Sequence, residues 1–211
     1  MKKLTALLLA LVLVLGLCAC GDTTTPESTP TTEAPAEDTI PTEDTIPTEE
    51  SVPAPIPNEA TDILDTIWAA YEGEEFFAMG GDMNNMVDGA PGNYDLADEG
   101  LTAMLYVPAD QVGNLVCASS LMHGMMANNF TCGMYLVSDE ADVKAFADAM
   151  KASLDSTQWM CGMPEKMLIA VVDTQYVLVA FGLEGVITSF ESALTTVHSG
   201  AEILYNEPIA G

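Results

Sequence analysis

The apolar residues of this chain fall into three regions that differ in pattern. Residues 4–17 form an almost unbroken apolar run, and residues 20–58 consist mainly of Thr, Pro and acidic residues. From 59 to 211, short apolar runs alternate with polar segments, which is typical of a folded domain. We therefore expect a leader at 1–19, a linker at 20–58 and one domain at 59–211.

Three helices are predicted within the domain. The first begins after Asn58, a residue type that caps helices, and ends near Gly73. The second begins after Ser138, which we expect to be its cap, and the third spans 184–197. The first two place apolar residues on one face, namely Ile63, Leu64, Ile67, Trp68 and Tyr71 in the first and Val143, Phe146, Ala147, Met150 and Leu154 in the second.

Strands are predicted where β-branched and aromatic residues form short runs between turn residues. Residues 173–175 divide two such runs and mark the clearest hairpin. Residues 79–100 have no period, so we expect them to be irregular, as is the tail after Gly200. The predicted strands are 101–107, 115–121, 131–137, 167–172 and 176–181.

The order helix, strands, helix, hairpin, helix is typical of an α+β fold. We expect a mainly antiparallel sheet with helices packed on one face, preceded by a disordered linker. The linker is rich in Pro and like charges and has no apolar face to bury. It is either a plain spacer or a glycosylated threonine stalk.

The charge is strongly negative. The chain has 32 acidic residues, five lysines and no arginine, with a formal net charge of −27. Loss of Lys2 and Lys3 with the leader makes this −29. Such a charge repels nucleic acid, so we expect no nucleic-acid partner. A solvated surface explains the acidity more simply than cation binding does.

The end of the apolar run carries a processing motif. Leu17-Cys18-Ala19-Cys20 resembles the lipobox of bacterial lipoproteins. The resemblance implies a leader at 1–19 that is cleaved before Cys20, a lipid on the Cys20 thiol, and attachment to the extracytoplasmic face of the cell membrane. Cys18 fits less well because bulky Leu17 would then precede the cleavage site. The alternatives are an ordinary secretory signal and an uncleaved anchor.

A second resemblance concerns the folded domain. The predicted helix after Ser138, the hairpin strands 170–172 and 176–179 and the bend 125–128 are similar to a domain of unknown function found in small lipoproteins of Gram-positive anaerobes. That family implies no activity and no catalytic residues.

Motifs for catalysis are missing from the sequence. The two histidines, His123 and His198, have no neighbouring hydrolase motif, and no phosphate-binding glycine loop is present. Residues 82–89 offer oxygen ligands but depart from the EF-hand pattern. We therefore expect a protein that is not an enzyme and has no cofactor.

Sulfur is the unusual feature. Two predicted loops are rich in it, and tracing the strands places both at the same end of the sheet. Methionine thioethers either pack and contact a partner or, with a thiolate and an imidazole, bind Cu(I). The candidate ligands are Met122, His123, Met125, Met126, Met160, Cys161 and Met163.

One disulfide is possible. In a hairpin that is symmetric about residues 124 and 125, Cys117 and Cys132 lie opposite each other. We expect any bridge to join these two, with Cys161 free.

Taken together, these patterns favour a lipid-anchored, non-enzymatic binding module that contacts an envelope protein. The alternative is soft-metal binding through the sulfur-rich loops.

Overall fold

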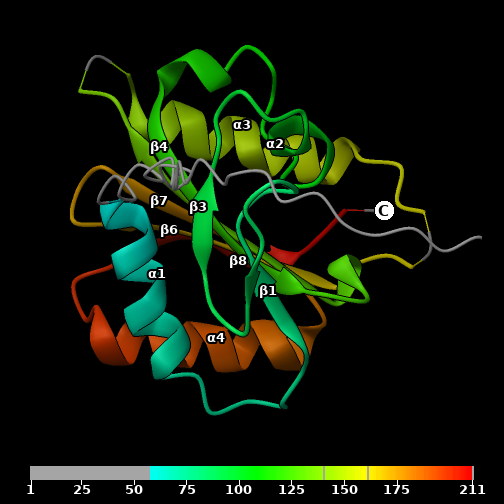
Figure 1. Cartoon of the computed structure of the whole chain (residues 1–211). Helices are drawn as coiled ribbons and strands as arrows, with labels where there is room; N and C mark the ends of the chain where they lie inside the picture. Colours follow the sequence, from blue (N-terminus) through cyan, green and yellow to red (C-terminus); the bar gives the residue numbers. More distant parts are fainter. Residues whose placement is uncertain (1–57, 140, 161, 211) are drawn as a thin grey trace, which may run out of the picture. The chain divides into compact units, whose positions relative to one another are not determined.

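The computed structural model describes residues 58–139, 141–160 and 162–210, whose helices and strands are arranged as in Figure 1. The predicted leader, Cys20 and linker lie outside the described residues. The helices are α1 (Glu59–Ala69), α2 (Gly100–Ala103), α3 (Val143–Ser156) and α4 (Glu184–Val197). The strands are β1 (Ala78–Gly80), β2 (Val87–Asp88), β3 (Gly92–Tyr94), β4 (Leu115–His123), β5 (Phe130–Val137), β6 (Lys166–Val172), β7 (Tyr176–Gly182) and β8 (Glu202–Pro208).

All strands belong to one antiparallel sheet in the order β2-β1-β4-β5-β7-β6-β8. β1 and β3 share one edge of β4, with β1 opposite residues 121–123 and β3 opposite residues 118–120. The predicted α+β fold with a mainly antiparallel sheet is confirmed.

The helices cover both faces of the sheet, so the expectation that they share one face is wrong. Alternate residues of β7 point to opposite faces, as in any strand. Leu178 packs in a core cluster with α1 and α4, and Val179 packs in a second cluster with α2 and α3. Figure 1 shows α3 on one side of the sheet and α4 on the other. Central strands that are buried on both faces explain the near-continuous apolar runs of β6 and β7.

Side-chain caps start two of the helices. The Asn58 carboxamide accepts a hydrogen bond from Ala60 N (3.0 Å), which confirms the predicted cap. Its Nδ2 donates to Ala118 O (2.8 Å), so the same side chain holds α1 against β4. The predicted cap Ser138 is wrong, because Asp142 accepts from Lys144 N and Ala145 N instead.

Three further predictions need correction. Residues 101–107 are not a strand, since α2 occupies their start. Leu101 and Leu105 are four residues apart, so a helical turn places both on the same side, where they pack in the core. Residues 79–100 are not wholly irregular, since they contain β2, β3 and most of β1. The tail after Gly200 forms β8, which pairs with β6.

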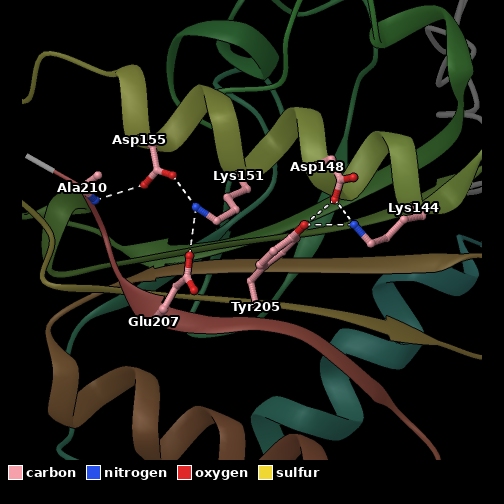
Figure 2. A network of polar contacts seen from close by, with 7 residues as sticks. All are labelled: Lys144, Asp148, Lys151, Asp155, Tyr205, Glu207 and Ala210. Atoms are coloured by element: carbon pink, nitrogen blue, oxygen red, sulfur yellow. Dashed lines mark hydrogen bonds and ion pairs between the residues drawn. The ribbon is translucent and has the colours of Figure 1, made fainter.

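β8 is held to α3 by a polar network (Figure 2). Lys151 Nζ lies 2.5 Å from Asp155 Oδ2 and 2.9 Å from Glu207 Oε1. Lys144 pairs with Asp148 and donates to Tyr205 Oη (3.0 Å). None of the described helices is both long and apolar enough to cross a bilayer.

Candidate functional site: a methionine pocket

The two predicted sulfur-rich loops do meet. Asn128 Nδ2, in the turn between β4 and β5, donates to Met160 O (2.9 Å) and Gly162 O (2.6 Å). Their methionine side chains point largely into solvent, since Met125 is 79% exposed and Met160 is 80% exposed. Met126 and Met163 are also exposed, and Cys161 lies outside the described residues.

Met122 and His123 cannot share a metal ion with each other, because neighbouring residues of a strand point to opposite faces. Met122 packs with the α3 cluster. The His123 ring stacks on Phe76, with ring centroids 5.3 Å apart, and its Nδ1 accepts from the backbone N–H groups of the following bend. The seven predicted ligands are therefore not gathered at one point.

The predicted disulfide between Cys117 and Cys132 is absent, and both cysteines are free. Cys117 pairs with Leu136, and Cys132 pairs with Leu121. The predicted pairing assumed a short bend centred on residues 124 and 125. The observed bend between β4 and β5 is longer, because a 3-10 turn at Ala127–Asn129 extends it. The two thiols are therefore four residues apart along the ladder, about 13 Å.

A different group of methionines forms a pocket of about 230 Å³. Its methionines come from three separate segments: β1 and the loop after it, the end of α2, and β4. Met79 and Met122 are directly opposite each other on β1 and β4, so their thioethers lie on the same face of the sheet. We name this site the methionine pocket, and its methionines are Met79, Met83, Met86, Met104 and Met122.

Part of the wall packs closely against Gly124. A Cβ on Gly124 would lie 2.8 Å from Met79 Sδ, closer than atoms of this kind approach. The missing side chain at Gly124 thus lets the Met79 thioether lie flat against the backbone of the β4–β5 bend. At the mouth, Met83 and Met86 are 64% and 57% exposed.

Asp82 also lines the pocket and is buried. Its carboxylate accepts hydrogen bonds from Asn84 N (2.8 Å), Asn85 N (3.0 Å) and Asp95 N (3.2 Å). Burial raises the pKa of Asp82, but these hydrogen bonds lower it by more, so the carboxylate is ionised at neutral pH. Of the oxygens in residues 82–89 that could bind calcium, those of Asp82 are therefore used to close a loop.

Tyr94 also lines the pocket. It is buried, and its hydroxyl has no hydrogen-bond partner among the described residues. Burial, and then the charges of Asp98 and Asp82, raise the pKa of Tyr94 to about 12. A buried, neutral hydroxyl beside an ionised carboxylate gives this otherwise apolar site two polar groups.

The methionines of the pocket contribute apolar, polarizable surface. Thioethers neither donate nor accept protons near neutral pH, so they cannot act as general acids or bases. Among the described residues, no three His, Cys, Asp or Glu side chains are placed to hold a metal ion.

The sequence contained one sign of the pocket that was missed. Met79, Met83 and Met86 repeat with an i, i+4, i+7 spacing, which normally marks a helix face. Here the segment is a strand followed by a turn, and its close packing depends on the distant β4.

Comparison with protein-family models, curated proteins and solved structures returned no match.

Proposed function

We propose that this protein is a non-enzymatic binding module, held by a lipid on Cys20 at the extracytoplasmic face of the cell membrane, whose ligand site is the methionine pocket. The observation that carries the proposal is the convergence of five methionine side chains from three segments on one pocket of about 230 Å³. The resemblance of residues 17–20 to a lipobox supports the location. Replacing Cys20 with Ser is expected to release the protein from the membrane fraction.

The occupant is an apolar side chain of an envelope protein. Methionine is flexible and polarizable, so a methionine-lined surface adapts to several apolar shapes. Covering the exposed Met83 and Met86 removes apolar area from water, and burying one leucine-sized side chain contributes about 1.5–3 kcal/mol. Exposed Asp88 lies opposite Met79, and exposed Asp95 bonds through its N–H to Asp82. These carboxylates favour a partner segment whose apolar residue is flanked by lysines.

Methionine methyl spectra of the full-length protein test this proposal. Short peptides with a central Leu or Phe between lysines are expected to shift the methyl signals of the pocket methionines, and not that of buried Met150. A peptide with a central Asp is the control. If the Leu and Asp peptides cause the same shifts, the pocket does not recognise apolar groups.

A second candidate is Cu(I) binding in the same pocket. Two observations favour it: Met79 and Met122 face each other across the strands, and ionised Asp82 supplies a negative charge in the lining. Thioethers are soft ligands that suit Cu(I). Unlike the seven ligands expected from the sequence, these methionines line one pocket.

Leucine substitutions separate the two candidates because leucine keeps the apolar volume and removes the sulfur. We expect Met79→Leu/Met122→Leu to retain peptide binding. A matched control is Met125→Leu/Met160→Leu, which changes two exposed methionines outside the pocket. Stoichiometric Cu(I) binding under reducing conditions that is lost in the first variant and kept in the second would establish metal binding instead.

A further inference from the structure

A second pocket, of about 480 Å³, lies at the C-terminal end of α1. Three aromatic rings and two carboxylates line it, and it shares no lining residue with the methionine pocket. We name it the aromatic pocket, and its residues are Trp68, Tyr71, Glu72, Gly73, Glu75 and Phe76.

The three rings pack into one aromatic corner. Trp68 stacks on Tyr71 with centroids 5.1 Å apart, and Phe76 meets Tyr71 nearly edge-on, with centroids 6.0 Å apart and planes at 73°. Trp68 and Phe76 are tilted by 52°. All three rings are only partly buried, so they retain accessible surface.

Hydrogen bonds from their polar atoms hold two of the rings in place, and packing holds the third. Trp68 Nε1 donates to Gly89 O (2.9 Å), and Tyr71 Oη donates to Glu74 O (3.2 Å). Phe76 is wedged against Phe130, with centroids 5.3 Å apart. The indole N–H and the phenol are committed to backbone carbonyls, Trp68 and Tyr71 each use one face in their mutual stack, and Phe76 uses one face in its stack on His123. What the rings offer a ligand is therefore the π surface that these stacks leave uncovered.

Every charge at this pocket is negative. Glu72 and Glu75 are exposed carboxylates on its wall. The C-terminus of α1, which carries the negative end of the helix dipole, has no basic residue in its last turn. The lysines of the described domain are elsewhere, since Lys144, Lys151 and Lys166 are all ion-paired with other carboxylates.

We propose that the aromatic pocket binds a methylated ammonium group. The faces of Trp, Tyr and Phe rings attract cations, and a quaternary ammonium loses little hydration when it lies against them. A primary ammonium is strongly hydrated and would have to exchange its water for hydrogen bonds to Glu72 and Glu75, which the aromatic faces cannot provide. The same chemistry occurs in free choline and in a choline lipid headgroup.

The experiment compares choline with 3,3-dimethylbutanol, which has the same shape but a carbon atom in place of the charged nitrogen. Full-length Trp159→Phe protein is used, so that Trp68 is the only tryptophan that reports binding. Choline is expected to change the Trp68 fluorescence saturably, and the neutral analogue to bind at least about tenfold more weakly. Equal affinity for the two compounds, or no saturable change with choline, overturns the proposal.

Two variants locate the site. Glu72→Gln/Glu75→Gln removes the charges, leaves the rings in place and is expected to weaken choline binding severalfold at low salt. Trp68→Leu removes the fluorescent reporter, so its choline binding is monitored by the choline methyl NMR signal. Its affinity for choline is expected to fall at least about tenfold. Unchanged affinity in both variants would place the ligand elsewhere and contradict the assignment.

Glycerophosphocholine identifies the source of the group. Tighter binding than choline indicates a lipid headgroup, and weaker binding, expected from repulsion between its phosphate and Glu72, indicates a free methylated amine.

Discussion

Asp82 shows how one buried carboxylate organises the loop that forms the mouth of the methionine pocket. Its two oxygens accept hydrogen bonds from the residues that follow Met83 and from Asp95 N, which comes after β3. The side chain thus joins the segment that bears Met83 and Met86 to the segment that ends in Tyr94. Removing an acceptor here leaves partly buried N–H groups without partners, which is costly.

We predict that Asp82→Asn lowers the free energy of unfolding by about 1–3 kcal/mol at neutral pH. Hydrogen bonds lower the pKa of Asp82 despite its burial. Its stabilisation is therefore present above the unfolded pKa of about 3.8 and is lost as the pH falls through the lower native pKa. Urea unfolding at neutral and acid pH measures both effects.

The difference between wild type and Asp82→Asn should therefore narrow below about pH 4. Asp88→Asn is the matched control, because Asp88 is exposed on β2 and its replacement should change stability little. A pH-independent difference would show that the hydrogen-bonded carboxylate is not the cause.

Among the helices and strands, the sequence predicted the ones whose own apolar residues form a recognisable face. α4, β4, β5 and the β6–β7 hairpin were predicted close to their observed bounds. α1 and α3 were found with wrong ends, since α1 ends at Ala69 and not near Gly73, and α3 begins at Val143 and not directly after Ser138. β2 and β3 were missed because they have only two and three residues. β8 was missed because all of its residues are exposed or half-buried. Its attachment comes from pairing with β6 and from contacts with Lys151 and Lys144, all of them distant in the chain.

The candidate site was predicted only in part, for a related reason. Methionine enrichment was visible, and the two loops do meet through Asn128. The side-chain directions were not visible: Met122 and His123 are neighbours in sequence but face opposite sides of the sheet. Met104 joins Met79 and Met122 only because α2 replaces a predicted strand.

The polar network of Figure 2 leads to the prediction that Lys151→Met loosens β8. Lys151 bridges Asp155 and Glu207, and both lysine and Asp155 are largely covered. Loss of the bridge should lower the free energy of unfolding by about 1 kcal/mol. It should also speed hydrogen exchange of the β8 amides while those of β5 and β7 keep their protection.

Lys166→Met is the matched control, because it removes the same charge from a pair with Glu191 on α4. Lys166 lies opposite Pro208 of β8, but its ion pair does not involve a β8 side chain. Burial raises the pKa of Asp155, but its bonds to Lys151 and Ala210 N lower it by more. The stabilisation that ionised Asp155 gives the folded state is therefore present above about pH 4, and it is lost as the pH falls through the lower native pKa of Asp155. Equal β8 exchange in both variants would contradict this role for Lys151.

At the scale of the whole molecule, charge is distributed very unevenly. No lysine or arginine occurs between Lys3 and Lys144. Both pockets are built from residues within that stretch. Uncompensated negative charge therefore surrounds both candidate sites, which favours cationic or lysine-flanked ligands and disfavours nucleic acid.

The same imbalance predicts that salt stabilises the protein. Acidic residues repel one another in the folded state, and α1 gives a local example: burial, and then the charge of Asp62, raise the pKa of Asp65. The Debye length falls from about 30 Å at 0.01 M salt to about 8 Å at 0.15 M, so most of this repulsion is then screened. We expect the melting temperature to rise by a few degrees over this range.

Asp65→Asn separates the two causes, because salt screens the repulsion from Asp62 and leaves the cost of burying the charge unchanged. A raised native pKa means that ionised Asp65 destabilises the fold above that pKa, and that the penalty disappears as the pH falls below the unfolded value of about 3.8. The variant should therefore melt at a higher temperature than wild type at neutral pH and low salt, and its advantage should shrink both in 0.15 M salt and at acid pH. A gain that survives both conditions would point to helix propensity, since screening and protonation leave propensity unchanged.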